Sequence, residues 1–207
     1  GSRALVIGPG PIGLATVYAL SYLAPDVEIT VAGLGPFADA FALQAGARHL
    51  VHGTRRELVE DAARVLDTAI HGNRISGPVL DDGFDTVFDA VGSEQTLDDS
   101  FRMARPRGTI VLIGTSSDQK VDWSLVWARE LTVRGTVYYG DEHVPATANV
   151  PGGRHRAMAS ALDILVDAQP SHLVTHVFPL DQPVRALSTA AAGPGASAVK
   201  VAFQPNR

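Results

Sequence analysis

Ala4-Leu5-Val6-Ile7-Gly8-Pro9-Gly10-Pro11-Ile12-Gly13 joins a short apolar run to a glycine-rich turn. The apolar run predicts a strand buried on both faces, and apolar residues at helical spacing follow over residues 12–23. Gly8, Gly10 and Gly13 satisfy the pattern G-x-G-x-x-G. The first glycine permits a tight turn, the second lets the backbone approach a pyrophosphate, and the third lets the helix pack against its strand. In this strand–turn–helix context the motif predicts a dinucleotide site, with a purely structural turn as the alternative.

Strands and helices alternate outward from this turn. Six strands separated by helices predict an α/β fold with a doubly wound parallel sheet, because parallel neighbours need crossover connections. The expected strand order is 3-2-1-4-5-6. Gly46 ends the second helix at a position that favours a left-handed cap. The expected strands are residues 4–8, 27–31, 49–51, 84–91, 109–114 and 131–139, and the expected helices are 12–23, 37–45, 55–70, 94–104 and 124–130.

Two stretches rich in glycine, proline, asparagine and aspartate predict irregular structure, residues 71–83 and 140–156. The last part of the chain forms a C-terminal α/β tail outside the six-stranded pattern, with helices at 157–168 and 181–192 and strands at 173–178 and 198–203. We therefore expect a Rossmann domain over residues 1–140, and a segment over residues 141–207 that completes the fold.

The composition is that of an ordinary globular protein. Of the 207 residues, 45% are hydrophobic and 19% are charged, with 17 basic against 22 acidic side chains and a net charge of −5. The acidic balance argues against a nucleic-acid partner. The absence of cysteine excludes disulfides, thiolate zinc sites and a cysteine nucleophile. No apolar run reaches the roughly 20 residues that cross a bilayer, and no secretion signal is present. The chain is expected to be cytoplasmic, without a membrane partner.

The choice between NAD and NADP stays open at the sequence level. An acidic residue for the adenosine ribose is expected about 20 residues after the glycine-rich turn, at the end of the second strand. That position reads Ala32-Gly33-Leu34-Gly35, and Asp39 lies inside the next helix. The missing carboxylate favours NADP. However, the basic residues available for a 2′-phosphate are Arg55 and Arg56, which follow the third strand.

For several other polar groups, a structural role is a simpler interpretation than a functional one. His49 with His52, and His172 with His176 on one expected strand, lack a third ligand at useful spacing, so no metal site is predicted. The loop Asp141-Glu142-His143 is a candidate substrate contact, but the simpler interpretation is that this loop is exposed to solvent and contacts no substrate. Three arginines at an expected helix C-terminus suit the helix dipole: Arg102, Arg105 and Arg107. None of the four tyrosines has a lysine four residues on, which excludes a short-chain dehydrogenase.

In its order of segments, the chain resembles the cofactor-binding half of the medium-chain dehydrogenases/reductases, the zinc-type alcohol dehydrogenase superfamily. The resemblance covers nearly all 207 residues. The segments that carry it are Gly1-Ser2-Arg3-Ala4-Leu5-Val6-Ile7-Gly8, Phe84-Asp85-Thr86-Val87-Phe88-Asp89-Ala90-Val91-Gly92, Arg107-Gly108-Thr109-Ile110-Val111-Leu112-Ile113-Gly114, Glu130-Leu131-Thr132-Val133-Arg134-Gly135, Val174-Thr175-His176-Val177-Phe178-Pro179-Leu180 and Val199-Lys200-Val201.

The resemblance implies a role for each matching position. Residues of the turn would bind the pyrophosphate, with Lys200 near the phosphates and Gly33 at the adenosine ribose. Val91 and Gly92 would border the adenine-side ribose and the cofactor cleft. Ile113, Gly114 and Thr115 would flank the nicotinamide, and Val137 and Tyr138 would hold its carboxamide through backbone groups. The whole set of expected cofactor-binding residues is Gly8, Gly10, Pro11, Ile12, Gly13, Gly33, Val91, Gly92, Ile113, Gly114, Thr115, Val137, Tyr138 and Lys200.

The resemblance also implies a reaction, in which hydride passes between an alcohol or polyol carbon and NAD or NADP. Family members carry their zinc ligands and proton relay in an N-terminal domain, which would be missing here. We therefore expect an inactive fragment with no catalytic or metal residue of its own. The family also pairs sixth strands in dimers, which implies a homodimer through residues 131–137. The alternative is a non-catalytic NAD(P)-binding sensor or scaffold; a methyltransferase lacks support in these segments.

Overall fold

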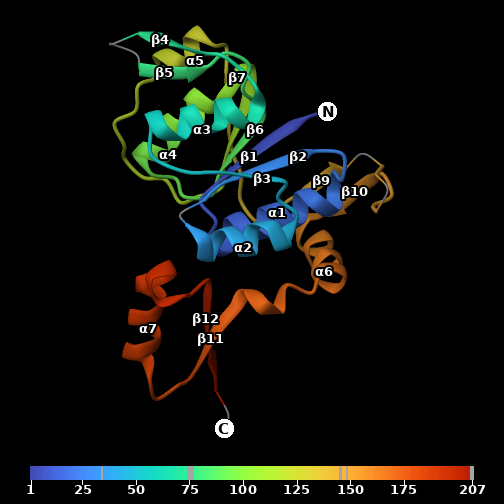
Figure 1. Ribbon diagram of the computed structural model, residues 1–207. Helices are drawn as coiled ribbons and strands as arrows, with labels where there is room; N and C mark the ends of the chain where they lie inside the picture. The colour runs from blue at the N-terminus through green and yellow to red at the C-terminus, as the bar shows by residue number, and fades with distance from the viewer. Residues whose placement is uncertain (34, 74–76, 145, 148, 206–207) are drawn as a thin grey trace.

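Six parallel strands form the central sheet of the computed structural model, which describes residues 1–33, 35–73, 77–144, 146–147 and 149–205 (Figure 1). The strand order is β3-β2-β1-β6-β7-β8, which confirms the predicted order when only the strands of this sheet are counted. The doubly wound Rossmann fold is thus present. Its strands are β1 (Arg3–Ile7), β2 (Glu28–Ala32), β3 (His49–Val51), β6 (Phe84–Asp89), β7 (Ala104–Leu112) and β8 (Thr132–Gly135).

Helices cover both faces of this sheet, and β1 shows why. Leu5 and Ile7 pack in the core cluster beneath α3 and α4, whereas Val6 between them packs in the cluster beneath α1 and α2. This alternation is the period of two that a strand imposes on its side chains. The helices are α1 (Pro11–Leu23), α2 (Pro36–Ala45), α3 (Arg56–Leu66), α4 (Glu94–Met103) and α5 (Ser124–Ala128). Gly46 adopts the predicted left-handed conformation after α2, with φ of 115°.

The six strands end in register at one edge of the sheet. Ile7 at the end of β1 pairs with Ala32 of β2 on one side and with Asp89 of β6 on the other. Ala32 pairs with Val51 at the end of β3, and Leu112 at the end of β7 pairs with Asp89 and with Gly135 of β8. Because the strands are parallel, the segments that follow them all leave the sheet at this carboxyl edge.

Two stretches expected to be irregular contain antiparallel hairpins instead. The first is β4 (Ile70–Asn73) paired with β5 (Gly77–Leu80), and the second is β9 (Asp141–Val144) paired with β10 (Gly153–Arg156). The sequence predicted loops here because glycine, proline and charged residues within these strands hide the alternation of apolar and polar residues that is typical of a strand. The helix expected over residues 55–70 also ends early, since Asp67 takes a left-handed conformation with φ of 50°.

Two strands of the main sheet have a bound that differs from the prediction by four residues or more. β7 begins at Ala104 rather than at residue 109, and its pairing with β6 is irregular between Phe84 and Thr86. Arg107 within it has φ of 62°, a conformation that few residues with a side chain favour. No pattern in the sequence predicts this conformation. β8 ends at Gly135, four residues before the expected end of the sixth strand.

The C-terminal tail stands outside the central sheet, as expected, and lies beside α2 (Figure 1). It comprises α6 (Ala157–Ala168), a 3-10 turn (Pro170–Leu173), β11 (Val174–Pro179), α7 (Pro183–Ala192), a second 3-10 turn (Gly193–Ala196) and β12 (Lys200–Gln204). β11 and β12 pair in parallel. His172 connects the tail to the sheet layers, because its Nε2 lies 3.0 Å from the Tyr18 hydroxyl and its ring stacks on Phe41. No helix in the described ranges has both the length and the hydropathy to span a bilayer.

Candidate dinucleotide site

The glycine-rich turn between β1 and α1 is fixed by two glycines and open at a third. Gly8 has φ of 93°, which favours glycine, and a Cβ there would overlap the Val91 side chain. A Cβ on Gly13 would overlap the Gly8 carbonyl oxygen, so α1 can approach the turn only because residue 13 has no side chain. Gly10 has no atom within 4 Å of the position where its Cβ would lie. The turn therefore presents bare backbone to open space at Gly10.

The start of α1 adds unpaired donors at the same place. Gly10 is the N-cap and Pro11 is the first helical residue. The first N–H groups of a helix have no acceptor within the helix, and the helix dipole makes this end positive. Here these groups belong to Ile12 and Gly13. The side chain of Ile12 is exposed, so the helix start is accessible to an anion.

A small cavity of about 190 Å³ separates this turn from α2 and the tail. Lys200 directly follows the tail residues that border it, and its side chain is exposed. The structure thus brings the tail residues that precede Lys200 to the glycine-rich turn. The cavity is lined by Pro9, Gly10, Pro11, Phe37, Ala38, Ala190, Gly193, Pro194, Ala198 and Val199.

The segments that follow β6 and β7 pack backbone against backbone. Gly92 has φ of 77°, and a Cβ on Gly114 would overlap the Val91 backbone. Asp89, fully buried, organises both segments. Its Oδ1 accepts hydrogen bonds from the backbone N–H groups of Val91 (3.0 Å) and Gly92 (2.9 Å). Its carbonyl oxygen accepts from those of Ile113 (2.9 Å) and Gly114 (3.0 Å).

Asp89 and Gln119 are functional candidates that the sequence reasoning missed. The amide of Gln119 donates a hydrogen bond to the Gly92 carbonyl oxygen, and its Oε1 is buried without a partner among the described residues. Asp89 could have been identified from the sequence, because it is an acidic residue at the end of a buried strand, shortly before a glycine. No local pattern marks Gln119, because its contact spans 27 residues.

Val137 and Tyr138 follow β8 at the same edge of the sheet. Both side chains are exposed, and the Tyr138 ring packs edge-on against Tyr139 at a centroid distance of 5.4 Å. Thr115 follows Gly114 and is exposed as well. The expected nicotinamide residues therefore follow the ends of neighbouring strands, β7 and β8.

Gly33 follows β2 and is packed against an acidic side chain. A Cβ there would overlap Oδ1 of Asp39 and would lie 3.1 Å from Nε2 of His52. Of the two expected 2′-phosphate partners, Arg56 is engaged elsewhere: it forms an ion pair with Glu60 at 2.6 Å and lines a separate cavity beside the β4–β5 hairpin.

The histidine pairs singled out in the sequence have partners other than metals. His49 bonds to Glu28 at 2.8 Å, and His52 to Asp39 at 2.8 Å. His172 lies in the 3-10 turn and His176 on β11, so the expectation of one shared strand was wrong. Within the described ranges, no three metal-ligating side chains gather at one place.

The arginine cluster was also placed wrongly. Arg102 does lie in the last turn of α4, where it pairs with Asp98. Arg105 and Arg107 instead lie on β7, because the strand begins directly after α4; they pair with Asp85 and Glu130. In the hairpin that follows β8, Asp141 pairs with Arg154 at 2.9 Å.

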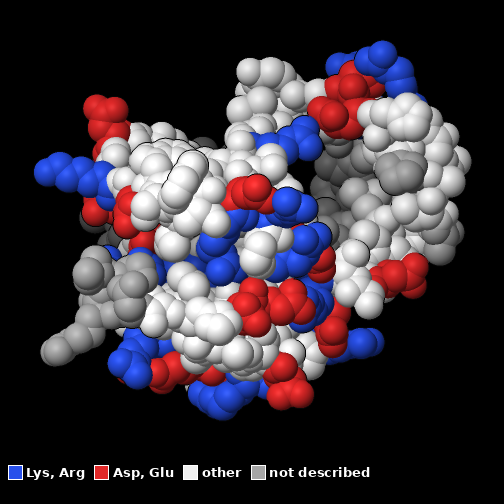
Figure 2. Space-filling model, turned by 90° about the horizontal axis from the view of Figure 1, so that it is seen from above, with Lys and Arg blue, Asp and Glu red and all other residues white. Residues whose placement is uncertain are grey.

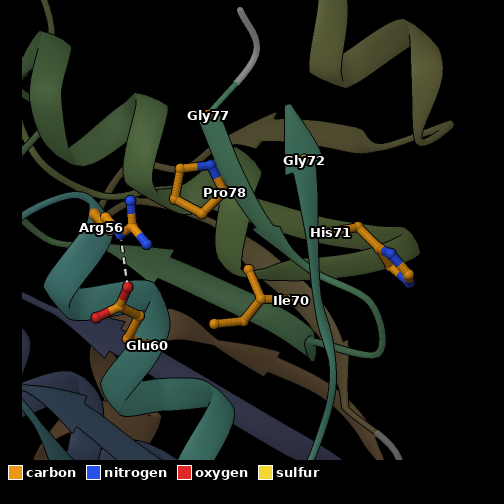
Figure 3. Close-up of a pocket in the computed structure, with 7 residues that line it drawn as sticks. All are labelled: Arg56, Glu60, Ile70, His71, Gly72, Gly77 and Pro78. Atoms are coloured by element: carbon orange, nitrogen blue, oxygen red, sulfur yellow. Dashed lines mark hydrogen bonds and ion pairs between the residues drawn. The ribbon is translucent and has the colours of Figure 1, made fainter. Parts of the chain in front are cut away.

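A separate cavity of about 570 Å³ has none of the residues of the glycine-rich turn in its lining (Figure 3). It is bounded by α3 and the β4–β5 hairpin, and the Arg56–Glu60 ion pair lies on its α3 side. Its remaining lining residues are Ile70, His71, Gly72, Gly77 and Pro78. None of them belongs to the carboxyl edge of the sheet, so this cavity is not the dinucleotide candidate.

Charges do not form a single-sign patch on the face of the molecule seen in Figure 2. Basic and acidic side chains alternate over it.

Comparisons with known proteins agree with this geometry. Residues 11–150 match the model of the zinc-binding dehydrogenase family. The chain is 31% identical to the L-threonine 3-dehydrogenase of Ruegeria pomeroyi, over 83% of this chain and 51% of that protein. A zinc-dependent alcohol dehydrogenase of Streptococcus pneumonia shares the fold with a TM-score of 0.73 and 19% identity, over 100% of this chain and 53% of that one. A short chain alcohol dehydrogenase of Escherichia coli CFT073, solved with NADH, gives a TM-score of 0.70 and 21% identity, over 97% and 51%. The chain spans about half the length of the relatives it matches.

Proposed function

Because the chain belongs to the zinc-binding dehydrogenase family, within the medium-chain dehydrogenases/reductases, we propose that it holds a nicotinamide dinucleotide for hydride transfer to or from an alcohol or polyol carbon. The observation that carries this proposal is the turn at Gly10. Bare backbone and unpaired helical N–H groups lie there at the edge where six strands end in register, which is where open α/β sheets bind ligands.

The residues present fit such a ligand along the whole edge. Gly10 and the N–H groups of Ile12 and Gly13 would bind the pyrophosphate, with Lys200 adding positive charge. Gly33 would lie at the adenosine ribose. Further along the edge, Val91 and Gly92 would border the adenine-side ribose and the cofactor cleft. Ile113, Gly114 and Thr115 would flank the nicotinamide, and Val137 and Tyr138 would hold its carboxamide through backbone groups.

The chain's own residues bind and orient, and the nicotinamide ring, when bound, supplies the carbon that gives or takes the hydride. We propose that residues 1–140 perform this binding and that residues 141–207 close the site from the tail side. We assign the zinc ligands and the groups that polarise the substrate oxygen to the part of the relatives that this chain does not cover. The 207 residues would then bind the dinucleotide without turning over substrate.

We also propose that the intact protein forms a homodimer by pairing β8 with its copy. β8 is an edge strand of the sheet, and an edge strand leaves backbone donors and acceptors available to another strand.

The first test separates binding from folding by comparing Gly10→Ala with Gly13→Ala. An added Cβ at Gly10 meets no atom within 4 Å, so that variant should keep its melting temperature. Its affinity for NADH, followed by nicotinamide fluorescence, should fall about tenfold or more because the methyl group occupies the position of the pyrophosphate. Gly13→Ala should melt at a lower temperature, since its Cβ overlaps the Gly8 carbonyl oxygen.

Unchanged NADH affinity in a folded Gly10→Ala variant would contradict the proposed pyrophosphate site. If the folded wild-type chain bound NADH but the intact gene product showed no dehydrogenase activity, a sensor or scaffold role would replace the enzymatic one.

A further inference from the structure

No acidic residue follows β2 directly in the sequence, but the fold brings one to the end of this strand. Asp39, in the first turn of α2, directs its carboxylate back onto Gly33. A Cβ on Gly33 would overlap Oδ1 of Asp39, so the carboxylate occupies the volume that a side chain at residue 33 would need. That Oδ1 is buried and has no hydrogen-bond partner among the described residues, and the Asp39 side chain is 15% exposed.

His52, which follows β3, holds this carboxylate in place. Its Nε2 lies 2.8 Å from the other carboxylate oxygen of Asp39. Its backbone N–H donates to Asp61 of α3 at 2.7 Å, and Arg64 pairs with that same Asp61 at 3.0 Å. Asp39 is thus fixed from β3 and α3, while Arg64 is engaged by Asp61.

We propose that Asp39 selects NAD(H) over NADP(H) by placing a carboxylate at the adenosine ribose, where β2 itself supplies none. This inference rests on the proposed function, and it reverses the preference for NADP that the missing acid suggested. A 2′-hydroxyl is neutral and can donate a hydrogen bond to a carboxylate. A 2′-phosphate carries about −1.5 to −2 charges at neutral pH, by analogy with other phosphomonoesters, and would be repelled.

The repulsion requires proximity and not contact. At an effective dielectric constant of about 20, unit charges roughly 8 Å apart already change an affinity by about 30-fold. Arg56 is paired with Glu60, so a neighbouring carboxylate already balances its charge. His52 is the cation-forming side chain that contacts Asp39 among the described residues.

The test compares four ligands on the full 207-residue chain by calorimetry and thermal shift. NADH is paired with NADPH, and ADP-ribose with its 2′-phosphate, because the second pair probes the adenosine half alone. The wild type should prefer the ligand without the 2′-phosphate by about 30-fold or more in both pairs. Asp39→Asn, which removes the charge and keeps the shape, should reduce that preference to a few fold.

Asp26→Asn is the matched control. It removes the same charge from an exposed residue just before β2, at the opposite end of the strand from Gly33. Its ligand preference should equal that of the wild type. Unliganded melting temperatures of both variants show whether either substitution unfolds the chain.

Three outcomes would overturn the inference. If the wild type binds the 2′-phosphorylated ligands as tightly as the others, or if Asp39→Asn keeps the full preference, Asp39 does not select the cofactor and the proposed function stands. If a folded wild type binds none of the four ligands, the dinucleotide site itself is wrong and the inference fails with it.

Discussion

The Asp99 carboxyl is a charged group placed where water cannot reach it. It lies on the buried side of α4, and its Oδ1 has no partner among the described residues. Burial is the main cause that raises its pKa to about 6, and the neighbouring Asp98 adds to the effect. The charges of Arg55 and Arg102 and a hydrogen bond from Gln95 oppose it.

This raised pKa predicts a pH-dependent cost. In the unfolded chain the carboxyl titrates near 3.9, so between about pH 4 and pH 6 the folded state binds more protons than the unfolded state. Stability due to Asp99 is therefore fully present below pH 4 and is lost as the pH rises through 6. Relative to wild type, Asp99→Asn should gain free energy of unfolding over this range, by at most about 3 kcal/mol, and change no further above pH 7.

Urea unfolding of both proteins at pH 4 to 8 measures this difference, and all other titrations cancel in it. A difference that stays constant with pH would show that Asp99 does not titrate in this window.

At the scale of elements, one side chain joins three of them. Arg129 follows α5 and is half-buried, which lowers its pKa. Its Nη2 donates hydrogen bonds to the carbonyl oxygens of Leu80 in β5 (2.7 Å) and Ala104 in β7 (2.6 Å). The guanidinium therefore ties the β4–β5 hairpin to the central sheet.

Arg129→Met should cost about 3 kcal/mol of unfolding free energy, because two carbonyl groups lose a charged donor. Arg129→Lys should cost less, since an ammonium can still reach one of them. Arg48→Met serves as the control: Arg48 is exposed and lies 3.9 Å from Glu28, so its loss should cost less than about 1 kcal/mol. Denaturant melts would contradict the assignment if Arg129→Met and Arg48→Met proved equally stable.

The elements also show what a sequence can and cannot reveal. The glycine-rich turn is local, so its residues and its position between a strand and a helix could be predicted. The β4–β5 hairpin depends on a close approach of Gly72 to Gly77, across residues that resemble a loop. The same limit applies to the candidate site: Asp39 reaches Gly33, and His52 reaches Asp39, only through the packing of α2 against the sheet.

At the scale of the whole molecule, the tail returns to the place where the chain begins. Val199 packs against the core beneath α1 and α2, and together with Ala198 it borders the small cavity at the glycine-rich turn. Lys200 comes directly after them. Residues 9–11 and residues from 190–199 thus meet at one cavity, although the neighbouring strands β1 and β12 belong to separate sheets.

We expect Lys200→Gln to weaken NADH binding several-fold at low salt and to make it less sensitive to salt, since the contribution of an exposed lysine to anion binding is screened. Arg185→Gln is the control, because it removes the same charge from α7, where Arg185 lies over the Phe178 ring instead. Titrations at two ionic strengths measure both effects. Equal salt dependence in the wild type and Lys200→Gln would exclude a role for this lysine at the phosphates.

Because the six strands end in register, the sheet has two distinct edges, and their connecting segments differ in how freely their sequence and length can change. Every candidate ligand residue of the sheet follows a strand end, whereas turns such as Pro25–Asp26 precede the strands at the far edge. A turn there can lengthen, shorten or accept an inserted peptide without moving a strand end. Over evolutionary time, such turns are where this architecture can diverge most freely, and in the laboratory they are the natural places to attach a reporter.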